Sequence, residues 1–164
     1  MDKTLRQRVS MKNPVHFLAL GFGTGLVPMM PGTSGSLATV PILYAMSFVT
    51  FDVFITITFL SFLVGIYLCG KTARDLKMHD HGSIVWDEVV GMMVTFIAIP
   101  INPFSLLLGF LLFRFFDILK PWPIRVFDKH VHGGFGIMID DIVAGIMACA
   151  CLHGIFYLLP NMTT

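Results

Sequence analysis

Charged residues are scarce in this sequence, and their scarcity excludes several classes of protein. Only 13% of the 164 residues are Asp, Glu, Lys or Arg, about half the share in an average soluble domain. Because 55% of the residues are hydrophobic and the mean hydropathy is +0.81, the composition excludes a disordered chain. With 3 cysteines and 15 glycines, the chain is neither a disulfide-rich scaffold nor a collagen-like repeat. A very apolar globule or an integral membrane protein remains.

The few charges are also unevenly spread. Four long segments contain no Asp, Glu, Lys or Arg: residues 13–51, 53–70, 89–113 and 142–164. A helix that crosses a bilayer needs about 20 apolar residues, and a soluble protein of this size has too little interior to bury several such helices. The sequence therefore predicts an all-α, multi-pass membrane protein with roughly four to five apolar helices. We expect a single domain over residues 1–164.

Glycines and prolines divide the apolar segments. Residues 15–36 contain so many of them that this segment must pack against protein or line a polar cavity, since broken backbone cannot face lipid. The basic start of the chain is not followed by the uninterrupted apolar run of a signal peptide. A turn is expected at residues 100–103, which contain two prolines. Regular helices are expected at about residues 37–49, 53–69, 89–99, 104–116 and 142–159.

Lysine and arginine gather in three segments, residues 1–14, 71–77 and 114–129. Basic loops are retained on the cytoplasmic side of a membrane, and alternating spans place all three segments on that side. Nine of the ten acids lie in the same stretches or where these join the helices. The sequence therefore predicts a basic cytoplasmic tail over residues 1–14, with the polar chemistry at the cytoplasmic face.

Acidic residues at the expected ends of apolar helices are the first candidates for chemistry: Asp87, Glu88, Asp117, Asp140 and Asp141. Mg²⁺ takes oxygen ligands and is usually held by one or two carboxylates together with substrate phosphate. We therefore predict that the adjacent pairs Asp87–Glu88 and Asp140–Asp141 bind a metal. The alternative is that these acids cap helix N-termini and oppose the helix dipole. Capping explains one acid per helix, but adjacent acids at a membrane edge less well, because burying paired like charges is costly.

Basic residues lie between these acids. Arg114, Asp117 and Lys120 are spaced by three, which places them on one face of a continuous helix. They form either a row of salt bridges whose long side chains reach the membrane edge or a phosphate clamp beside a metal-binding acid. Spacing alone favours neither interpretation.

Glycines at residues 21–25 and 31–36 precede an expected helix. Such glycines let backbone N–H groups converge on an anion, and the hydroxyls of Thr33, Ser34 and Ser36 add donors. The alternative is a re-entrant turn in which one of these hydroxyls caps the next helix.

Two further patterns are weaker. Residues 65–72 match the P-loop string, but a P-loop needs a strand, an exposed loop and a helix, whereas this string continues an apolar helix. We therefore predict no nucleotide site there. The histidine pairs within residues 79–81 and 130–132 suggest zinc, but no cysteine lies near them, which favours solvated or hydrogen-bonding histidines.

Four segments together resemble the phosphatidylglycerophosphatase A family: GFGTGLVPMMPGTSGSL at 21–37, HDHGSIVWDEVVGM at 79–92, FRFFDILKPWPI at 113–124 and HGGFGIMIDDIVAG at 132–145. The resemblance extends from about Asn13 to Leu159. It implies a Mg²⁺-dependent phosphatase of the bacterial inner membrane that removes the terminal phosphate of phosphatidylglycerophosphate and leaves phosphatidylglycerol. It also implies an all-helical fold with a central helix surrounded by others. The acids Asp87, Glu88, Asp117, Asp140 and Asp141 correspond to its acidic centre.

The expected reaction is hydrolysis in which Mg²⁺ bridges carboxylates and the terminal phosphate, while one unbound carboxylate orients or deprotonates water. Arg114, Lys120 and Arg125 are expected to offset the remaining phosphate charge. The expected partners are the lipid substrate and the bilayer, and no nucleic acid. A small cation or proton transporter is an alternative, but it should carry ionisable residues inside its spans. A non-catalytic assembly subunit would not need paired acids beside basic residues.

Overall fold

A computed structural model describes residues 8–78 and 81–158, and every regular element within these ranges is a helix. The all-α prediction is therefore confirmed for this part of the chain. In chain order the helices are α2 Pro14–Ala19, the 3₁₀ helix η1 Gly21–Leu26, α3 Pro31–Met46, α4 Phe51–Leu76, α5 Trp86–Thr95, α6 Pro103–Leu119, α7 Ile124–His130 and α8 Gly133–Leu158.

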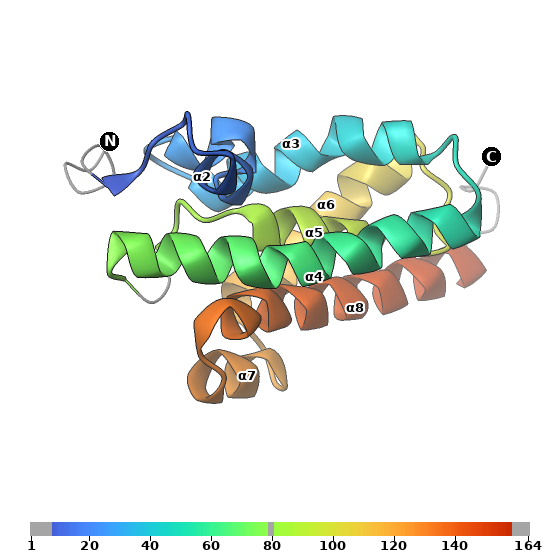
Figure 1. Cartoon of the computed structure of the whole chain (residues 1–164). Helices are drawn as coiled ribbons and strands as arrows, with labels where there is room; N and C mark the ends of the chain where they lie inside the picture. Colours follow the sequence, from blue (N-terminus) through green and yellow to red (C-terminus); the bar gives the residue numbers. More distant parts are fainter. Residues whose placement is uncertain (1–7, 79–80, 159–164) are drawn as a thin grey trace.

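Helix α5 is the centre of the bundle. Every residue from Asp87 to Thr95 is buried, and α3, α4, α6 and α8 all pack around this helix (Figure 1). The observed arrangement is the central helix that the family resemblance implies. Because α5 has only 10 residues, it extends about 15 Å and is too short to cross a bilayer.

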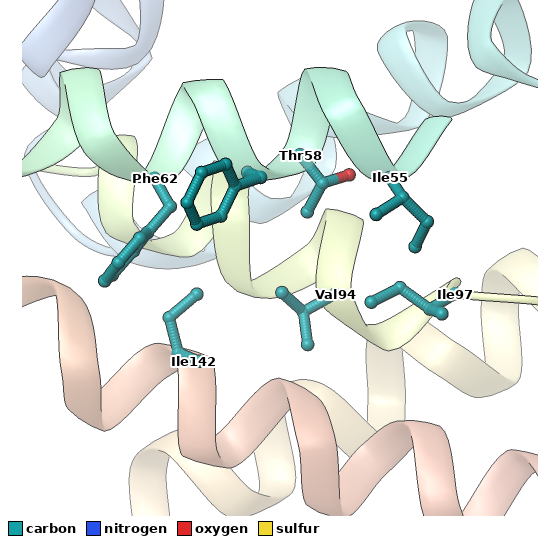
Figure 2. Close-up of a pocket in the computed structure, with 7 residues that line it drawn as sticks. Ile55, Thr58, Phe62, Val94, Ile97 and Ile142 are labelled. Atoms are coloured by element: carbon teal, nitrogen blue, oxygen red, sulfur yellow. The ribbon is translucent and has the colours of Figure 1, made fainter. Parts of the chain in front are cut away.

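Glycines allow α5 and α8 to approach closely. A Cβ atom on Gly145 would lie 2.5 Å from the carbonyl oxygen of Gly91, and one on Gly91 would lie 2.9 Å from that of Asp141. Small residues of this kind let helix backbones meet inside a membrane. Helix α4 lies on the other side of the same seam, where apolar side chains of all three helices point toward one another (Figure 2).

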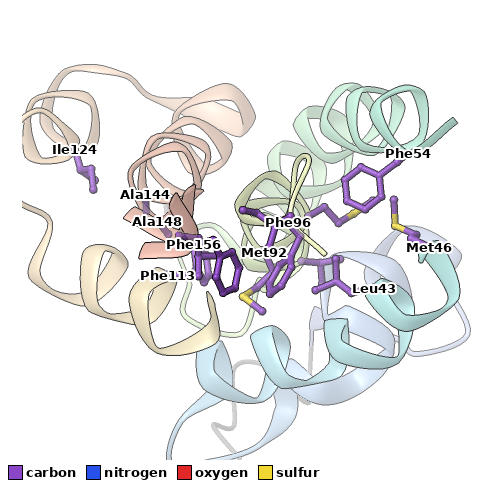
Figure 3. Packing of buried hydrophobic residues seen from close by; sticks show 14 residues of the cluster. Leu43, Met46, Phe54, Met92, Phe96, Phe113, Ile124, Ala144, Ala148 and Phe156 are labelled. Atoms are coloured by element: carbon purple, nitrogen blue, oxygen red, sulfur yellow. The ribbon is translucent and has the colours of Figure 1, made fainter. Parts of the chain in front are cut away.

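The main hydrophobic core joins six helices. One buried cluster contains Leu43 of α3, Phe54 of α4, Met92 of α5, Phe113 of α6, Ile124 of α7 and Ala148 of α8 (Figure 3). Buried apolar area of this kind stabilises the bundle, and in a membrane the close packing itself supplies much of the stabilisation.

Two of the described helices are long and apolar enough to cross a membrane, α4 and α8, each with 26 residues. Helices α3 and α6 are shorter, with 16 and 17 residues. At 1.5 Å per residue they extend about 24–26 Å, slightly less than the hydrocarbon thickness. The larger number of spans expected from the sequence therefore stays a prediction.

Several helix boundaries differ from those expected. Helix α4 continues past residue 69 to Leu76, because Lys71 and Asp75 pair across one helical turn. It passes unbroken through residues 65–72, so the rejection of a P-loop is confirmed. Helix α3 begins at Pro31 rather than near residue 37, because a proline fits the first helical position without cost.

The largest boundary error concerns α8, which begins at Gly133 rather than Ile142. Asp140 and Asp141 therefore lie about two turns inside the helix. The expectation that they open an apolar helix is wrong. Asp87 and Glu88 do lie in the first turn of α5, as expected.

The charged segments lie at one end of the bundle. In Figure 1 the end of α4, the whole of α7 and the beginning of α8 lie at the left, whereas the turn between α3 and α4 lies at the right. We call the first of these the charged end. The end of α4 contains Lys71 and Arg74, and α7 contains Arg125 and Lys129. Arg8 donates to the carbonyl of Leu76 at the end of α4, and Lys120 pairs with Asp128 of α7, so described basic residues of all three predicted cytoplasmic segments lie at this end.

Candidate functional site

Carboxylates from α5, α6 and α8 meet near the charged end. The negative charge of Asp141 is opposed by the nearby charges of Asp117, Asp87, Asp140 and Glu88. All but Asp117 are buried, and Asp141 is only 3% exposed. The structure thus brings together all the predicted acids, which we call the acidic cluster: Asp87, Glu88, Asp117, Asp140 and Asp141.

The N-terminus of α5 positions two members of the acidic cluster. Asp87 and Glu88 follow Trp86, the first residue of α5, so both carboxylates lie where the helix dipole favours negative charge. The backbone N–H of Val85 donates to the carbonyl of Ala19 at 2.9 Å, which ties this helix start to α2. The positions of Asp87 and Glu88 are thus compatible with stabilisation by the N-terminus of the helix.

The same explanation is wrong for the other pair. Asp140 and Asp141 lie inside α8, where backbone amides are already bonded within the helix. Asp140 Oδ2 instead accepts a hydrogen bond from Lys120 Nζ at 2.7 Å. Asp141 Oδ2 is buried and has no hydrogen-bond partner among residues 8–78 and 81–158. An unsatisfied buried carboxylate oxygen is costly, so this position calls for an explanation other than capping.

Arg114 lies between two acids of the cluster. Its Nη1 atom forms an ion pair with Asp117 and lies 3.7 Å from Glu88 Oε1. Asp117 is near the C-terminus of α6, where the helix dipole disfavours a negative charge, and Arg114 offsets that cost. The Arg114 side chain is only 15% exposed, so this ion pair is more buried than a simple surface salt bridge.

Lys120 connects three helices. It is the C-cap of α6 in the left-handed conformation, with φ 43°. Its Nζ atom donates to Asp128 of α7 and to Asp140 of α8. Burial by itself would lower the pKa of Lys120, but the two carboxylates outweigh burial and raise the pKa above its ordinary value. Lys120 therefore stays positively charged beside the acidic cluster.

The first turn of α3 borders the same acids. A Cβ atom on Gly32 would lie 2.1 Å from Glu88 Oε1 and 3.1 Å from Arg114 Nη1, and one on Gly35 would lie 3.1 Å from Glu88 Oε2. These glycines therefore make room for the charged side chains. The sequence predicted backbone donors for an anion at these glycines. Their spacing role could not be predicted, because it depends on side chains from other helices.

The three hydroxyl residues of this turn differ in burial and in their hydrogen bonds. Ser34 Oγ donates to the carbonyl of Met30, and Ser36 Oγ to that of Gly32, at 3.1 and 3.0 Å. Ser36 is fully buried, whereas Thr33 and Ser34 are half-buried. The N-cap of α3 is Met30, which makes no side-chain cap bond, so none of the three hydroxyl residues is the N-cap.

Arg125 is the predicted phosphate-binding residue that the structure does not bring to the cluster. It is exposed on α7, and within the described ranges it forms no ion pair. Asp128, one turn later, is instead the α7 residue connected to the cluster, through Lys120. The sequence gives no signal for Asp128, because its partner Lys120 lies outside the helix that contains it.

Comparison with known proteins now adds to this geometry. The phosphatidylglycerophosphatase A family model matches residues 17–156. Phosphatidylglycerophosphatase A of Escherichia coli (strain K12) is 50% identical over 156 residues, which cover 94% of this chain and 91% of that protein. The chain belongs to the phosphatidylglycerophosphatase A family. The protein of the same name from Haemophilus influenzae is also 50% identical, over 153 residues that cover 92% of this chain and 94% of the relative.

No solved structure shows a significant match to this chain. The matched range of the phosphatidylglycerophosphatase A family includes every member of the acidic cluster. The predicted family is thereby confirmed, and so is the expectation that the chain is an enzyme of the phosphoric monoester hydrolase class.

The bounds of α8 weaken the case against a transporter that the sequence offered. That case relied on spans free of charge, but α8 contains Asp140 and Asp141 and is one of the two helices long enough to cross a membrane. Helix α8 as a whole is therefore not free of charge. Membership in the phosphatidylglycerophosphatase A family is what favours an enzyme.

The acids fit a magnesium ion by their chemistry. Within the described ranges, no three His, Cys, Asp or Glu side chains are arranged to hold a metal by themselves. Mg²⁺ is commonly held by only one or two carboxylates, with water and substrate phosphate completing its shell. Buried Asp141 Oδ2, which has no hydrogen-bond partner in this part of the chain, is suited to such a role. His79 and Asp80 lie outside the described residues, while His130 and His132 are exposed.

Proposed function

We propose that this chain hydrolyses the terminal phosphate monoester of phosphatidylglycerophosphate to phosphatidylglycerol and inorganic phosphate, with Mg²⁺ as cofactor. The main structural support is the acidic cluster, which meets two basic side chains, Arg114 and Lys120, near one end of an apolar bundle. The names of the relatives support the substrate.

Positive side chains bind the substrate phosphate in this proposal. Arg114 presents a guanidinium next to Glu88 and Asp117, and guanidinium groups bind phosphate in a bidentate manner. Lys120 stays protonated and adds a second positive charge beside Asp140. Phosphoryl transfer depends mostly on such positioning and charge stabilisation.

The acids divide two roles between them. Asp141 and Asp87 would hold Mg²⁺, with Glu88 and Asp140 as neighbouring ligands. The metal supplies charge neutralisation for the phosphate and its leaving oxygen. A carboxylate of the cluster that does not bind the metal accepts a proton from the attacking water and orients it in line with the scissile bond. Asp117 is suited to this role, because Arg114 keeps its carboxylate fixed.

The lipid context follows from the surface of the bundle. Leu60 and Leu63 of α4 and Leu107 and Leu111 of α6 are all exposed, as expected for side chains that contact lipid tails. We propose a multi-pass protein of the bacterial inner membrane whose charged end faces the cytoplasm. The lysines and arginines of that end support this orientation.

A phosphate-release assay tests the proposal. Purified protein in detergent micelles is expected to release phosphate from phosphatidylglycerophosphate with Mg²⁺ present and to stop when EDTA is added. Phosphatidic acid and a water-soluble glycerol phosphate serve as comparison substrates, and both are expected to react more slowly. Equal turnover of phosphatidic acid would remove the proposed selectivity, and faster turnover of the soluble phosphate would overturn the lipid assignment. No phosphate release from any substrate is the result expected of a transporter or an assembly subunit.

A further inference from the structure

A groove lies in the seam between α4, α5 and α8, away from the contacts that form the acidic cluster. Its cavity measures about 230 Å³. Its lining includes Ile55, Thr58 and Phe62 of α4, Val94 and Ile97 in and after α5, and Ile142 of α8. Figure 2 shows these side chains pointing from the three helices toward a common space.

A second cavity of about 250 Å³ continues the groove along α8. It shares Val94 and Ile97 with the first, and it adds Ile146, Cys149, Ala150 and His153. Ile142, Ile146, Cys149 and His153 follow one another at helical spacing, so they form one stripe on α8. The two cavities therefore border one another at Val94 and Ile97.

The lining of the groove suits hydrocarbon rather than water. The only hydroxyl of the first cavity, that of Thr58, donates within α4 to the carbonyl of Phe54 at 2.9 Å. In the second cavity, His153 Nδ1 is bonded to the carbonyl of Cys149 at 2.9 Å. A cavity with so few polar groups in its lining is poorly suited to hold ordered water. An empty one would lose dispersion contacts on all its walls.

The groove begins near the acids and leads away from the charged end. Ile142 directly follows Asp141, and Val94 lies two turns after Asp87 on the same face of α5, about 10 Å further along the axis. The remaining lining residues extend toward the opposite end of α4 and α8, the two helices long enough to cross a membrane. A lipid whose headgroup is at the acidic cluster therefore has its tails at the depth of the groove.

We infer that the groove between α4, α5 and α8 holds an acyl chain of the phospholipid substrate. The inference rests on the proposed function, because it needs a substrate whose phosphate is held at the acidic cluster. Bulk lipid is equally apolar, so hydrophobicity alone selects no occupant. A chain of the bound substrate, however, is tethered at the mouth of the groove, and tethering gives it a high effective concentration over chains of other lipids.

A substitution that fills the groove tests the inference that it holds an acyl chain. Ile97 lines both cavities and is half-buried, so Ile97→Trp places a large ring where the two cavities join. Leu60→Trp is the matched control, because Leu60 is 53% exposed on α4 and is not among the residues that line either cavity. Each variant is assayed with dioleoyl phosphatidylglycerophosphate and with a water-soluble dihexanoyl analogue, whose much shorter chains fill less of the groove.

We expect Ile97→Trp to lower kcat/KM for the long-chain substrate at least about tenfold, because a displaced chain moves the phosphate away from the acids. The short-chain analogue and the Leu60→Trp protein should keep nearly wild-type values. If Ile97→Trp impairs both substrates equally or neither, the groove does not hold the substrate chain. If the wild-type protein hydrolyses neither substrate, the proposed function itself fails, and the two failures are thus distinguishable.

A labelling experiment keeps the inference testable if Ile97→Trp does not fold. Wild-type protein is irradiated with phosphatidylglycerophosphate carrying a diazirine near the middle of one chain, and cross-linked peptides are identified by mass spectrometry. Peptides containing Ile97 and Ile146 should dominate, and excess unlabelled substrate should remove that labelling. Labelling spread evenly over the exposed faces of α4 and α6 would show ordinary lipid contact and overturn the inference.

Discussion

Lys120 Nζ and Asp140 Oδ2 lie 2.7 Å apart and join the C-terminal cap of α6 to the interior of α8. The same ammonium group pairs with Asp128, so one positive charge connects α6, α7 and α8. The ion pair explains how an acid can lie inside an apolar helix, because Asp140 is buried next to a cation rather than in hydrocarbon.

Replacing Lys120 with Asn should destabilise the protein. Asn tolerates the left-handed backbone of this cap, so Lys120→Asn removes the charge without adding strain. We expect a loss of about 2 kcal/mol of unfolding free energy, typical of hydrogen bonds to charged groups. Lys77→Asn is the matched control, since Lys77 is also a left-handed helix cap but is exposed. Thermal unfolding in detergent measures both, and equal effects of the two substitutions would contradict this role for the ion pairs.

The difference in unfolding free energy between the wild-type and Lys120→Asn proteins depends on pH with a definite sign. The ion pairs raise the folded-state pKa of Lys120 above its ordinary value. The stabilisation is therefore complete below the unfolded-state pKa of about 10.4 and is lost only as pH rises through the higher folded-state pKa. The difference in stability between wild-type and Lys120→Asn proteins should stay constant from about pH 6 to about pH 9. A difference that shrinks within this window would show that Lys120 does not titrate as described.

The membrane orientation is tested by cysteine labelling of spheroplasts. In a protein that lacks Cys69, Cys149 and Cys151, Pro100→Cys and Lys129→Cys each introduce a single exposed thiol. Pro100 is preferable to Asn102, whose side chain forms the capping box of α6 with Ser105. An impermeant reagent should modify position 100 and spare position 129. The reverse pattern would show that the charged end faces away from the cytoplasm.

The sequence predicted the acids but not their positions within the helices. Composition and charge spacing indicated Asp140 and Asp141, because few acids occur beside so long an apolar run. Their place inside α8 could not be predicted, since Gly133, Gly134 and Gly136 suggest a loop. The structure shows why glycine is used there: a Cβ on Gly134 would lie 1.9 Å from the carbonyl oxygen of Ile66 on α4. A tertiary contact outweighs the low helix propensity of glycine.

Contacts between distant segments could likewise not be predicted from the sequence. The spacing of Arg114, Asp117 and Lys120 correctly predicted that Arg114 and Asp117 share a helix face. It could not predict that Lys120 leaves the helix and pairs with Asp128 and Asp140, because that depends on the left-handed cap.

Removing one carboxylate at the proposed metal site should separate activity from stability. Asp141→Asn keeps the shape of the side chain but removes a buried charge that four other carboxylates oppose. We expect at least about a hundredfold loss of rate, on the order of 3 kcal/mol of transition-state stabilisation, without loss of thermal stability. Asp87→Asn should act similarly, whereas Asp52→Asn, at an exposed acid of α4, should be neutral.

Magnesium supplies an independent measurement for the same variants. A ligand that binds only the folded state raises the unfolding temperature, so Mg²⁺ should stabilise the wild-type and Asp52→Asn proteins but not Asp141→Asn. Near-normal activity of Asp141→Asn in EDTA would remove this residue from the proposed metal site.

The closest packing near the acidic cluster gives the last prediction. Gly32 lies on the first turn of α3, and a Cβ atom there would be 2.1 Å from Glu88 Oε1. Gly32→Ala should therefore push Glu88 and Arg114 away from their positions. Because small displacements of catalytic groups reduce rates strongly, we expect an activity loss of about a hundredfold. The α3 helix itself should persist, since alanine favours helix over glycine by about 1 kcal/mol.

Gly154→Ala in α8 is the matched control, as a Cβ there meets nothing within 4 Å, and it should leave activity unchanged. Phosphate release and far-ultraviolet circular dichroism measure the two effects. Full activity of a folded Gly32→Ala protein would mean that Glu88 and Arg114 do not take part in the reaction at the positions seen here.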